Sequence, residues 1–330
     1  MKKNLLFLQS RIKPNLGYKL VTPGDIIEGE FKAIGVKDTQ GFNLIPYCID
    51  FKSNVLIHSV GVDPVEASKA TFQYDYIRKN AQYFLYTPLE SLAKSPPNIN
   101  ISAVLLFSPG RCGSTLLSKL IAEIGVPSIS EPDIYSQAAL YFAPKDKSHA
   151  KADQVRHLLR WANFFQLSPF LKMGAPNVLI KLRSHVNNGP GIVLSSFTGP
   201  HKTIFLKRDF HSWCMSRMRA FGNTIESNLD IYTRSLHCLR FLLKNSDCLV
   251  LDYEDLNKKP EAVLHKLSVF FGTPINMDQV KDVLGRDSQA DTNLARDKLK
   301  KALSAAEMEA IDKIWRHHAP HDLLKELDLA

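Results

Sequence analysis

No apolar run in the 330-residue chain approaches the ~18 residues needed to cross a bilayer. The basic start, Met1 to Lys3, is followed by the apolar segment Leu5 to Leu8, which is shorter than the core of a signal peptide. No small-residue cleavage site follows it. We therefore expect a cytoplasmic protein without a membrane span.

Cysteine is also scarce: the chain has five, an odd number, and none is spaced as Cys-x-x-Cys. This pattern argues against a disulfide framework and against a zinc knuckle. Lys/Arg tracts with interleaved aromatic residues are missing too, which disfavours a nucleic-acid partner. Together with 45% hydrophobic and 23% charged residues, these absences are typical of an ordinary soluble globular protein.

The positive charge that is present is unevenly distributed. The formal net charge is +9, and residues 101–280 carry 21 basic and 14 acidic side chains, a net +7. Residues 281–330 carry 9 basic and 10 acidic side chains, a net −1. A local excess of this kind favours an anionic ligand bound by the middle of the chain.

A linker divides the chain in two. Consecutive prolines in Lys94-Ser95-Pro96-Pro97-Asn98 stop regular structure. We expect a small α+β module of unassigned role in residues 1–95, with short strands up to residue 60 and helix over 63–92. We expect an α/β domain in residues 96–330.

The α/β domain shows apolar strands that alternate with amphipathic helices. Alternation of this kind predicts a mostly parallel sheet flanked by helices, with right-handed crossovers. Strands are expected at residues 101–107, 177–182, 202–207 and 248–252. Helices are expected at residues 114–124, 150–165, 210–221, 229–244, 260–271 and 298–317.

The turn between the first of these strands and its helix has the composition of an anion site. Free N–H groups and the positive end of the helix dipole meet there. Gly110 and Gly113 permit unusual φ angles, and Arg111 has a fork of donors that suits oxyanions. The alternative is a plain tight turn. No lysine stands between Gly113 and Ser114, which disfavours nucleotide triphosphates.

Three motifs then resemble those of one family, the sulfotransferases. Pro109 to Leu117 resembles their 5′-phosphosulfate loop in its Arg-Ser-Gly-Ser-Thr form, with Cys112 in place of the usual serine. Arg208 at a strand end, with Ser216 eight residues later, resembles their 3′-phosphate motif. Leu251 to Leu256, with Pro260 after it, resembles their Tyr-Glu-Asp-Leu…Pro segment.

The resemblance implies a P-loop-like α/β fold and 3′-phosphoadenosine 5′-phosphosulfate (PAPS) as sulfuryl donor, with no metal. It implies a hydroxyl or amine acceptor, such as a small molecule, carbohydrate or lipid. Arg208 and Ser216 would bind the 3′-phosphate, and Arg286, in a polar loop, is a further candidate. The phosphosulfate would lie on Gly110, Arg111, Cys112, Gly113, Ser114 and Thr115.

Two residues compete as the base that takes the acceptor's proton. Glu131 follows a short expected strand and matches the base used with this type of loop in the family, and His185 follows the strand at 177–182. Arg111 is the expected stabiliser of charge on the bridging oxygen. The alternatives are a P-loop kinase, or a binding protein that keeps the fold without catalysis. The sequence leaves the acceptor and the oligomeric state open.

Overall fold

The computed structural model describes residues 3–7, 11–13, 16–27, 29–35, 42–143, 149–274, 277–285 and 303–329. Arg286 and the first part of the helix expected at 298–317 lie outside the described residues. The chain divides into two compact units. The first unit comprises residues 1–104 and 127–201, and the second comprises residues 105–126 and 202–330. The boundary expected after residue 95 stays a prediction.

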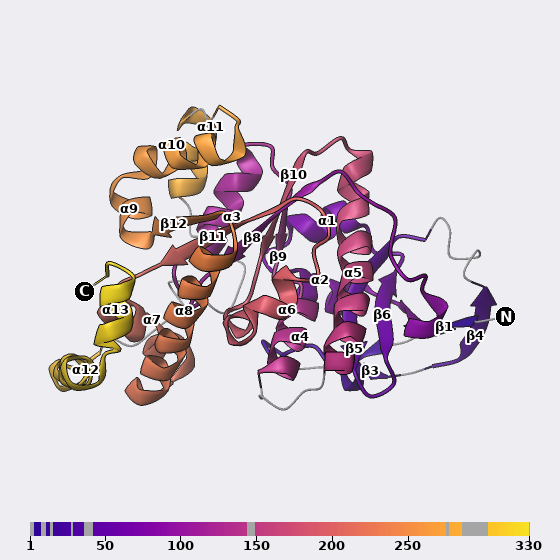
Figure 1. Cartoon of the computed structure of the whole chain (residues 1–330), viewed down its shortest axis with the longest axis horizontal. Helices are drawn as coiled ribbons and strands as arrows, with labels where there is room; N and C mark the ends of the chain where they lie inside the picture. Colours follow the sequence, from indigo (N-terminus) through magenta and orange to yellow (C-terminus); the bar gives the residue numbers. More distant parts are fainter. Residues whose placement is uncertain are drawn as a thin grey trace. The chain divides into compact units, whose positions relative to one another are not determined.

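An antiparallel sheet forms the N-terminal part of the first unit, in the order β4-β1-β7-β6-β5. Helix α5 lies along β5 and β6 (Figure 1). The short strands β2 and β3 pair separately. The strands are β1 (Lys3–Phe7), β2 (Arg11–Ile12), β3 (Ile26–Ile27), β4 (Phe31–Gly35), β5 (Leu44–Asp50), β6 (Val55–Val60) and β7 (Tyr83–Pro88).

The helix expected over residues 63–92 is correct only in part. Asp63 caps α1 by accepting hydrogen bonds from the amides of Val65 and Glu66, and α2 follows it. The prediction is wrong for Tyr83–Pro88, which forms β7 because its aromatic and β-branched side chains suit a pleated surface. The first unit's helices are α1 (Pro64–Lys69), α2 (Gln73–Asn80), α4 (Ile134–Phe142), α5 (His149–Lys172) and α6 (Pro190–Leu194), with 3-10 turns η1 (Pro23–Asp25), η3 (Leu89–Ser91) and η4 (Ser184–Asn188).

A second sheet, in the order β12-β11-β8-β10-β9, confirms the predicted α/β class. Strands β9 and β10 pair in parallel, as do β11 and β12. The chain leaves β8 toward β9 and β10, and it returns as β11 on the opposite side of β8. The strands are β8 (Ser102–Phe107), β9 (Ser128–Ser130), β10 (Asn177–Lys181), β11 (His201–Lys207) and β12 (Cys248–Asp252).

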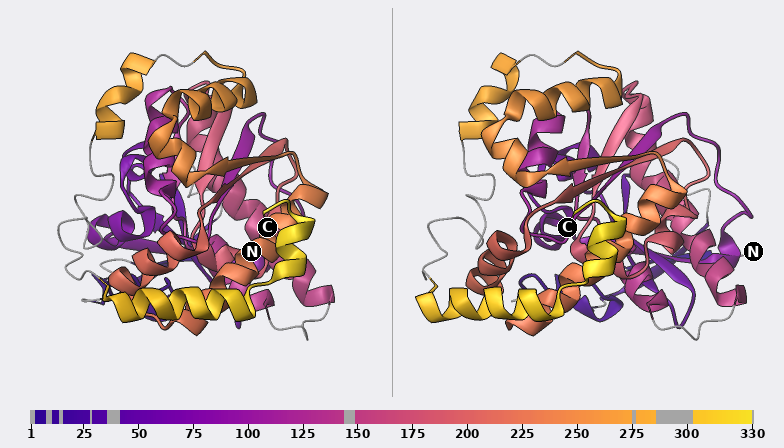
Figure 2. Two further views of the ribbon diagram at one scale, coloured as in Figure 1. Left: turned by 90° about the vertical axis from the view of Figure 1, so that its left-hand side faces the viewer. Right: turned by 60° about the vertical axis from the view of Figure 1, so that its left-hand side comes forward.

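Two helices of the second unit, α7 and α8, begin at side-chain caps. Asp209 accepts a hydrogen bond from the Ser212 amide at the start of α7, and Thr224 caps α8 in the same way. Helix α12 lies against α7 and α8 (Figure 2). These helices are α3 (Ser114–Glu123), α7 (Phe210–Phe221), α8 (Ile225–Asn245), α9 (Tyr253–Lys258), α10 (Pro260–Phe271), α11 (Met277–Gly285), α12 (Ala305–His318) and α13 (His321–Glu326).

In the part of the chain that the structure describes, no helix is both long enough and apolar enough to cross a membrane.

Candidate active site

The loop between β8 and α3 has an unusual backbone. Gly110 and Gly113 both have φ of 76°, in the left-handed region that glycine readily adopts. Arg111 between them has φ of 57°, although it carries a side chain. A non-glycine residue in this region is strained, and such strain gathers at functional sites. The loop therefore holds a conformation that its sequence alone would not favour.

Gly113 is the N-cap of α3 and has no side chain to cap the first turn. The first turn of α3 therefore has no side-chain cap, and an uncapped helix start is a general place for an anion to bind. A Cβ atom at Gly113 would stand 2.6 Å from two ring carbons of Tyr253, so the glycine also allows α9 to pack against the loop. Ser114 and Thr115, which follow, are buried in the first turn of α3.

The two predicted arginines lie against each other in the second unit. Arg208 Nη1 donates a hydrogen bond of 3.0 Å to the carbonyl oxygen of Arg111. Arg111 Nε lies 3.4 Å from Ser216 Oγ, in a long hydrogen bond. The structure thus gathers Arg111, Arg208 and Ser216 into one cluster beside the start of α3. The residues predicted to bind the phosphosulfate therefore lie next to those predicted to bind the 3′-phosphate.

Neighbouring elements fix this cluster. The indole Nε1 of Trp213 donates to the Gly110 carbonyl oxygen at 2.6 Å, and the Tyr232 hydroxyl donates to the Arg208 carbonyl oxygen at 2.8 Å. Cys112 is fully buried, and its Sγ lies 3.4 Å from the Gly110 carbonyl oxygen. The side chain of Cys112 thus packs inside the loop.

Arg208 also borders a cavity of about 390 Å³ in the second unit. Its guanidinium carbon lies 4.3 Å from the centre of the Tyr253 ring, in a cation–π arrangement. Its Nε is 3.7 Å from Glu254 Oε1. Lys207, one residue earlier, pairs with Asp252. The Arg208 side chain thus lies against the Tyr253 ring and the Glu254 carboxylate, and a second ion pair follows from the preceding residue.

Glu131 belongs to the first unit and has its own strained backbone, with φ of 56°. Its amide donates a 2.7 Å hydrogen bond to the Lys181 carbonyl oxygen, which ties the end of β9 to the end of β10. Lys181 Nζ lies 2.8 Å from Glu131 Oε1, and the lysine side chain is 1% exposed. The carboxylate is therefore held in one orientation by a buried cation.

Arg183, two residues after Lys181, forms a different pair. Its Nη1 contacts both oxygens of Asp133, at 2.9 and 2.8 Å, and its Nε is 3.8 Å from Glu131 Oε2. Burial raises the pKa of Asp133, and Arg183 opposes that rise. Lys181, rather than Arg183, is thus the cation in direct contact with Glu131.

His185 lies in the 3-10 turn η4 of the first unit, half-buried. Its carbonyl oxygen accepts a 2.8 Å hydrogen bond from Asn188 Nδ2. Both predicted bases, Glu131 and His185, belong to the first unit, and the predicted nucleotide-binding residues belong to the second.

Three residues at these sites had no role predicted from the sequence. Lys181 ends the strand β10 directly after apolar residues, and a lysine buried there needs a partner. Tyr253 and Glu254 stand in a quoted motif but received no role. Their contacts with Gly113 and Arg208 join segments more than 40 residues apart, so no local pattern signals them.

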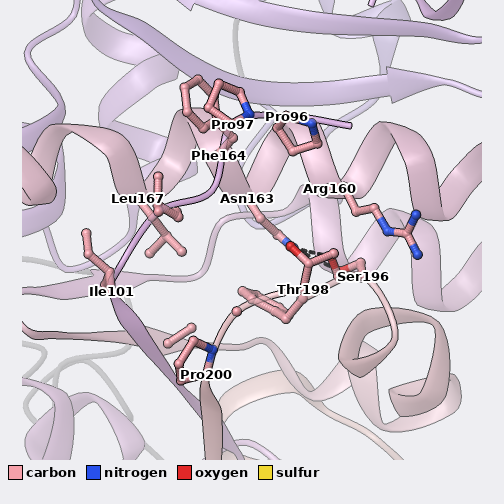
Figure 3. A pocket seen from close by; sticks show the side chains of 14 residues that line it. Pro96, Pro97, Ile101, Arg160, Asn163, Phe164, Leu167, Ser196, Thr198 and Pro200 are labelled. Carbon is pink, nitrogen blue, oxygen red and sulfur yellow. Dashed lines mark hydrogen bonds between the residues drawn. The ribbon is translucent and has the colours of Figure 1, made fainter. Parts of the chain in front are cut away.

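A second cavity, of about 30 Å³, lies in the first unit where Pro96 and Pro97 pack against α5 (Figure 3). Asn163 Nδ2 donates to Ser196 Oγ at 3.0 Å beside it, and Asn163 Oδ1 accepts from the Tyr135 hydroxyl at 2.9 Å. A space of this size holds about one water molecule. We therefore assign it to packing rather than to a substrate.

No family model and no curated protein matches the chain. Solved sulfotransferase structures are similar to it. A domain from the curacin biosynthetic pathway has 16% identity and a TM-score of 0.41, over 70% of this chain and 98% of that one. A mouse sulfotransferase complexed with PAP has 12% identity and a TM-score of 0.43, over 73% and 93%. A Mycobacterium avium sulfotransferase has 11% identity and a TM-score of 0.39, over 78% and 85%.

Proposed function

We propose that the chain is a sulfotransferase that moves the sulfuryl group of PAPS to a hydroxyl or amine acceptor. The observation that carries this proposal is the contact between Arg208 and the strained, glycine-flanked loop at the start of α3. PAPS bears a 5′-phosphosulfate and a separate 3′-phosphate, so a protein that binds it needs two adjoining anion sites. The loop supplies one and Arg208 with Ser216 the other.

The proposed reaction is a single in-line transfer. The acceptor oxygen or nitrogen forms a bond to sulfur while the bond between sulfur and the bridging oxygen breaks. The electron pair of that bond stays on the 5′-phosphate, which leaves as adenosine 3′,5′-bisphosphate. Arg111 and the α3 amides stabilise the charge that develops on the bridging oxygen. Because arginine stays protonated at ordinary pH, its contribution is electrostatic.

Glu131 is our proposed base for the acceptor proton. Its support is the fixed orientation that Lys181 imposes and the strained backbone at the carboxyl end of β9. His185 is the second candidate because an imidazole titrates near neutral pH. The acceptor is proposed only by chemical class, as a hydroxyl or amine compound.

Calorimetric titration with adenosine 3′,5′-bisphosphate, without magnesium, tests the nucleotide site. We expect saturable binding by the wild-type chain, and a loss of at least about tenfold in affinity for Arg111→Ala and for Arg208→Ala, because each removes a charged donor. Arg219→Ala is the matched control, since Arg219 lies exposed on α7. Preferential binding of ATP that magnesium strengthens would instead indicate a kinase.

A further inference from the structure

The side chain of Arg208 has one unmet donor. Its Nε is buried, and no described residue accepts a hydrogen bond from it. The nearest charged group is Glu254 Oε1 at 3.7 Å, which is within ion-pair distance but too long for a hydrogen bond. Nη1 of the same guanidinium is engaged by the Arg111 carbonyl oxygen. The Arg111 carbonyl oxygen and Glu254 therefore hold the Arg208 side chain in place, while its Nε–H makes no hydrogen bond to a described residue.

Glu254 in turn belongs to a group of carboxyls. Its amide donates a 2.9 Å hydrogen bond to Asp252 Oδ1, and its side chain lines the same cavity as Asp209, Asp252 and Asp255. Carboxylates gathered around one cavity repel each other, so such a group favours keeping a proton on one of its members. The charged or titratable groups around Glu254 are Cys112, Lys207, Arg208, Asp209, His211, Tyr232, Asp252 and Asp255.

The proton of this group resides on Glu254. Burial, followed by the hydrogen bond with Asp252, raises the pKa of Glu254 to about 7. Burial alone would raise the pKa of Asp252, but hydrogen bonds with Glu254 and Lys207 lower it. Near neutral pH, Glu254 therefore exchanges a proton with solvent while its neighbours stay ionised.

We propose that Glu254 is a proton-linked counter-charge for Arg208: its carboxylate balances the guanidinium in the free protein, and it takes up a proton when a phosphate monoester binds to Arg208. This inference rests on the proposed function, because it uses the 3′-phosphate of the nucleotide as that monoester. Glu254 acts here as a positioning residue for Arg208 and does not itself contact the reacting atoms.

The direction of the effect follows from charge repulsion. A bound phosphate dianion disfavours the Glu254 carboxylate, so it raises the pKa of Glu254 above its value in the free protein. Affinity for the nucleotide is then highest where Glu254 is protonated and falls as pH rises from 7 to 8.5. A change of one unit in that pKa corresponds to about a tenfold change in affinity. The phosphate's own second ionisation, near pH 6, lies below this window.

Calorimetric titration of the full chain with adenosine 3′,5′-bisphosphate tests the linkage. Measured at pH 7.5 in two buffers of different ionisation enthalpy, the wild-type chain should take up a fraction of a proton per nucleotide. For a rise of one unit in the pKa of Glu254, its affinity should fall about fourfold between pH 7 and 8.5. Glu254→Gln should take up none and keep the tighter affinity across this range. Glu261→Gln, at an exposed position on α10, should behave like the wild type.

The outcomes separate this inference from the proposed function. If the nucleotide binds but the wild-type chain takes up no proton, or if Glu254→Gln retains the wild-type pH dependence, the inference is wrong and the proposed function stands. If the nucleotide fails to bind at any pH, both are wrong. Adenosine 5′-phosphate, which lacks the 3′-phosphate, should bind without proton uptake, and uptake with it would contradict the assignment to Arg208.

Discussion

Two of the candidate site residues, Arg111 and Glu131, have an unusual backbone conformation. Only four non-glycine residues with positive φ occur among the described residues, and two of them are Arg111 and Glu131. Each such conformation costs about 1 kcal/mol or more, so it persists only where the surrounding contacts impose it. The sequence identified both as candidates by residue type and neighbouring motifs. It contained no signal for their φ angles, because the contacts of Glu131 with Lys181 and of Arg111 with Arg208 join segments far apart in the sequence.

The Glu131 carboxylate offers a direct test at this scale. Glu131→Gln keeps the shape of the side chain but removes its ability to accept a proton. We expect the single-turnover rate of sulfuryl transfer to a model alcohol to fall by about 10²–10⁴. Nucleotide affinity should be unchanged, because Glu131 is no part of the proposed nucleotide site.

Two variants serve as comparisons for that experiment. Glu66→Gln removes a carboxylate from an exposed pair with Lys69 and should keep the wild-type rate. His185→Ala should retain most of the activity. Loss of transfer in His185→Ala with retention in Glu131→Gln would assign the base to His185.

At the scale of elements, the segment of β8, its following loop and α3 contains the proposed anion-binding loop. The sequence predicted it because an apolar strand, a glycine turn and an amphipathic helix follow in direct succession. It also predicted the bounds of α7, α10 and β12, whose caps and apolar periodicity are local. It failed at β7, since that strand is held by pairing with β1 and β6. Helix α5 is longer than expected because it continues past Pro169.

Gly113→Ala tests the packing of this unit. The new Cβ would meet the Tyr253 ring at 2.6 Å, and alanine is strained at φ of 76°. We expect the free energy of unfolding, measured in urea, to fall by about 2–4 kcal/mol, together with a loss of nucleotide binding.

Gly222→Ala separates the two causes. Gly222 also has a positive φ, of 65°, but an added Cβ meets no atom within 4 Å. It should lose only about 1 kcal/mol. Equal losses in the two variants would show that the contact with Tyr253 contributes nothing.

For the molecule as a whole, the sequence predicted a parallel sheet but not its strand order. Order depends on which distant strands pair, and every apolar strand of similar length is locally equivalent. The order found places β11 next to β8, and this brings Arg208 to the loop of Arg111. The pairing of Glu131 with Lys181 depends in the same way on β9 lying beside β10. The residues of the site were thus predictable by type, but their contacts were not.

The stability of the whole chain should depend on the protonation of His58. This residue is fully buried in β6, and neither ring nitrogen has a hydrogen-bond partner among the described residues. Burial lowers the pKa of His58 to about 3. The unfolded chain, with a histidine pKa near 6.5, therefore binds a proton that the folded chain does not. This contribution is fully present above pH 6.5 and is lost progressively as pH falls toward 3.

His58→Leu removes that dependence. Leucine suits the apolar face formed by Leu44, Val60 and Leu85. Between pH 6.5 and 4.5, urea unfolding should show that the wild-type chain loses roughly 1–3 kcal/mol more than the variant. Parallel pH profiles for the two proteins would contradict the assignment.

Cys112 gives the loop a further property. Burial raises the pKa of its thiol, so the sulfur stays protonated and shielded from solvent while the loop keeps its shape. Thiolate is the form that reacts with oxidants and alkylating agents. The sulfur therefore becomes reactive only when the backbone around it opens. The rate at which Cys112 is modified would therefore measure how often the loop opens. A bound nucleotide would lower that rate.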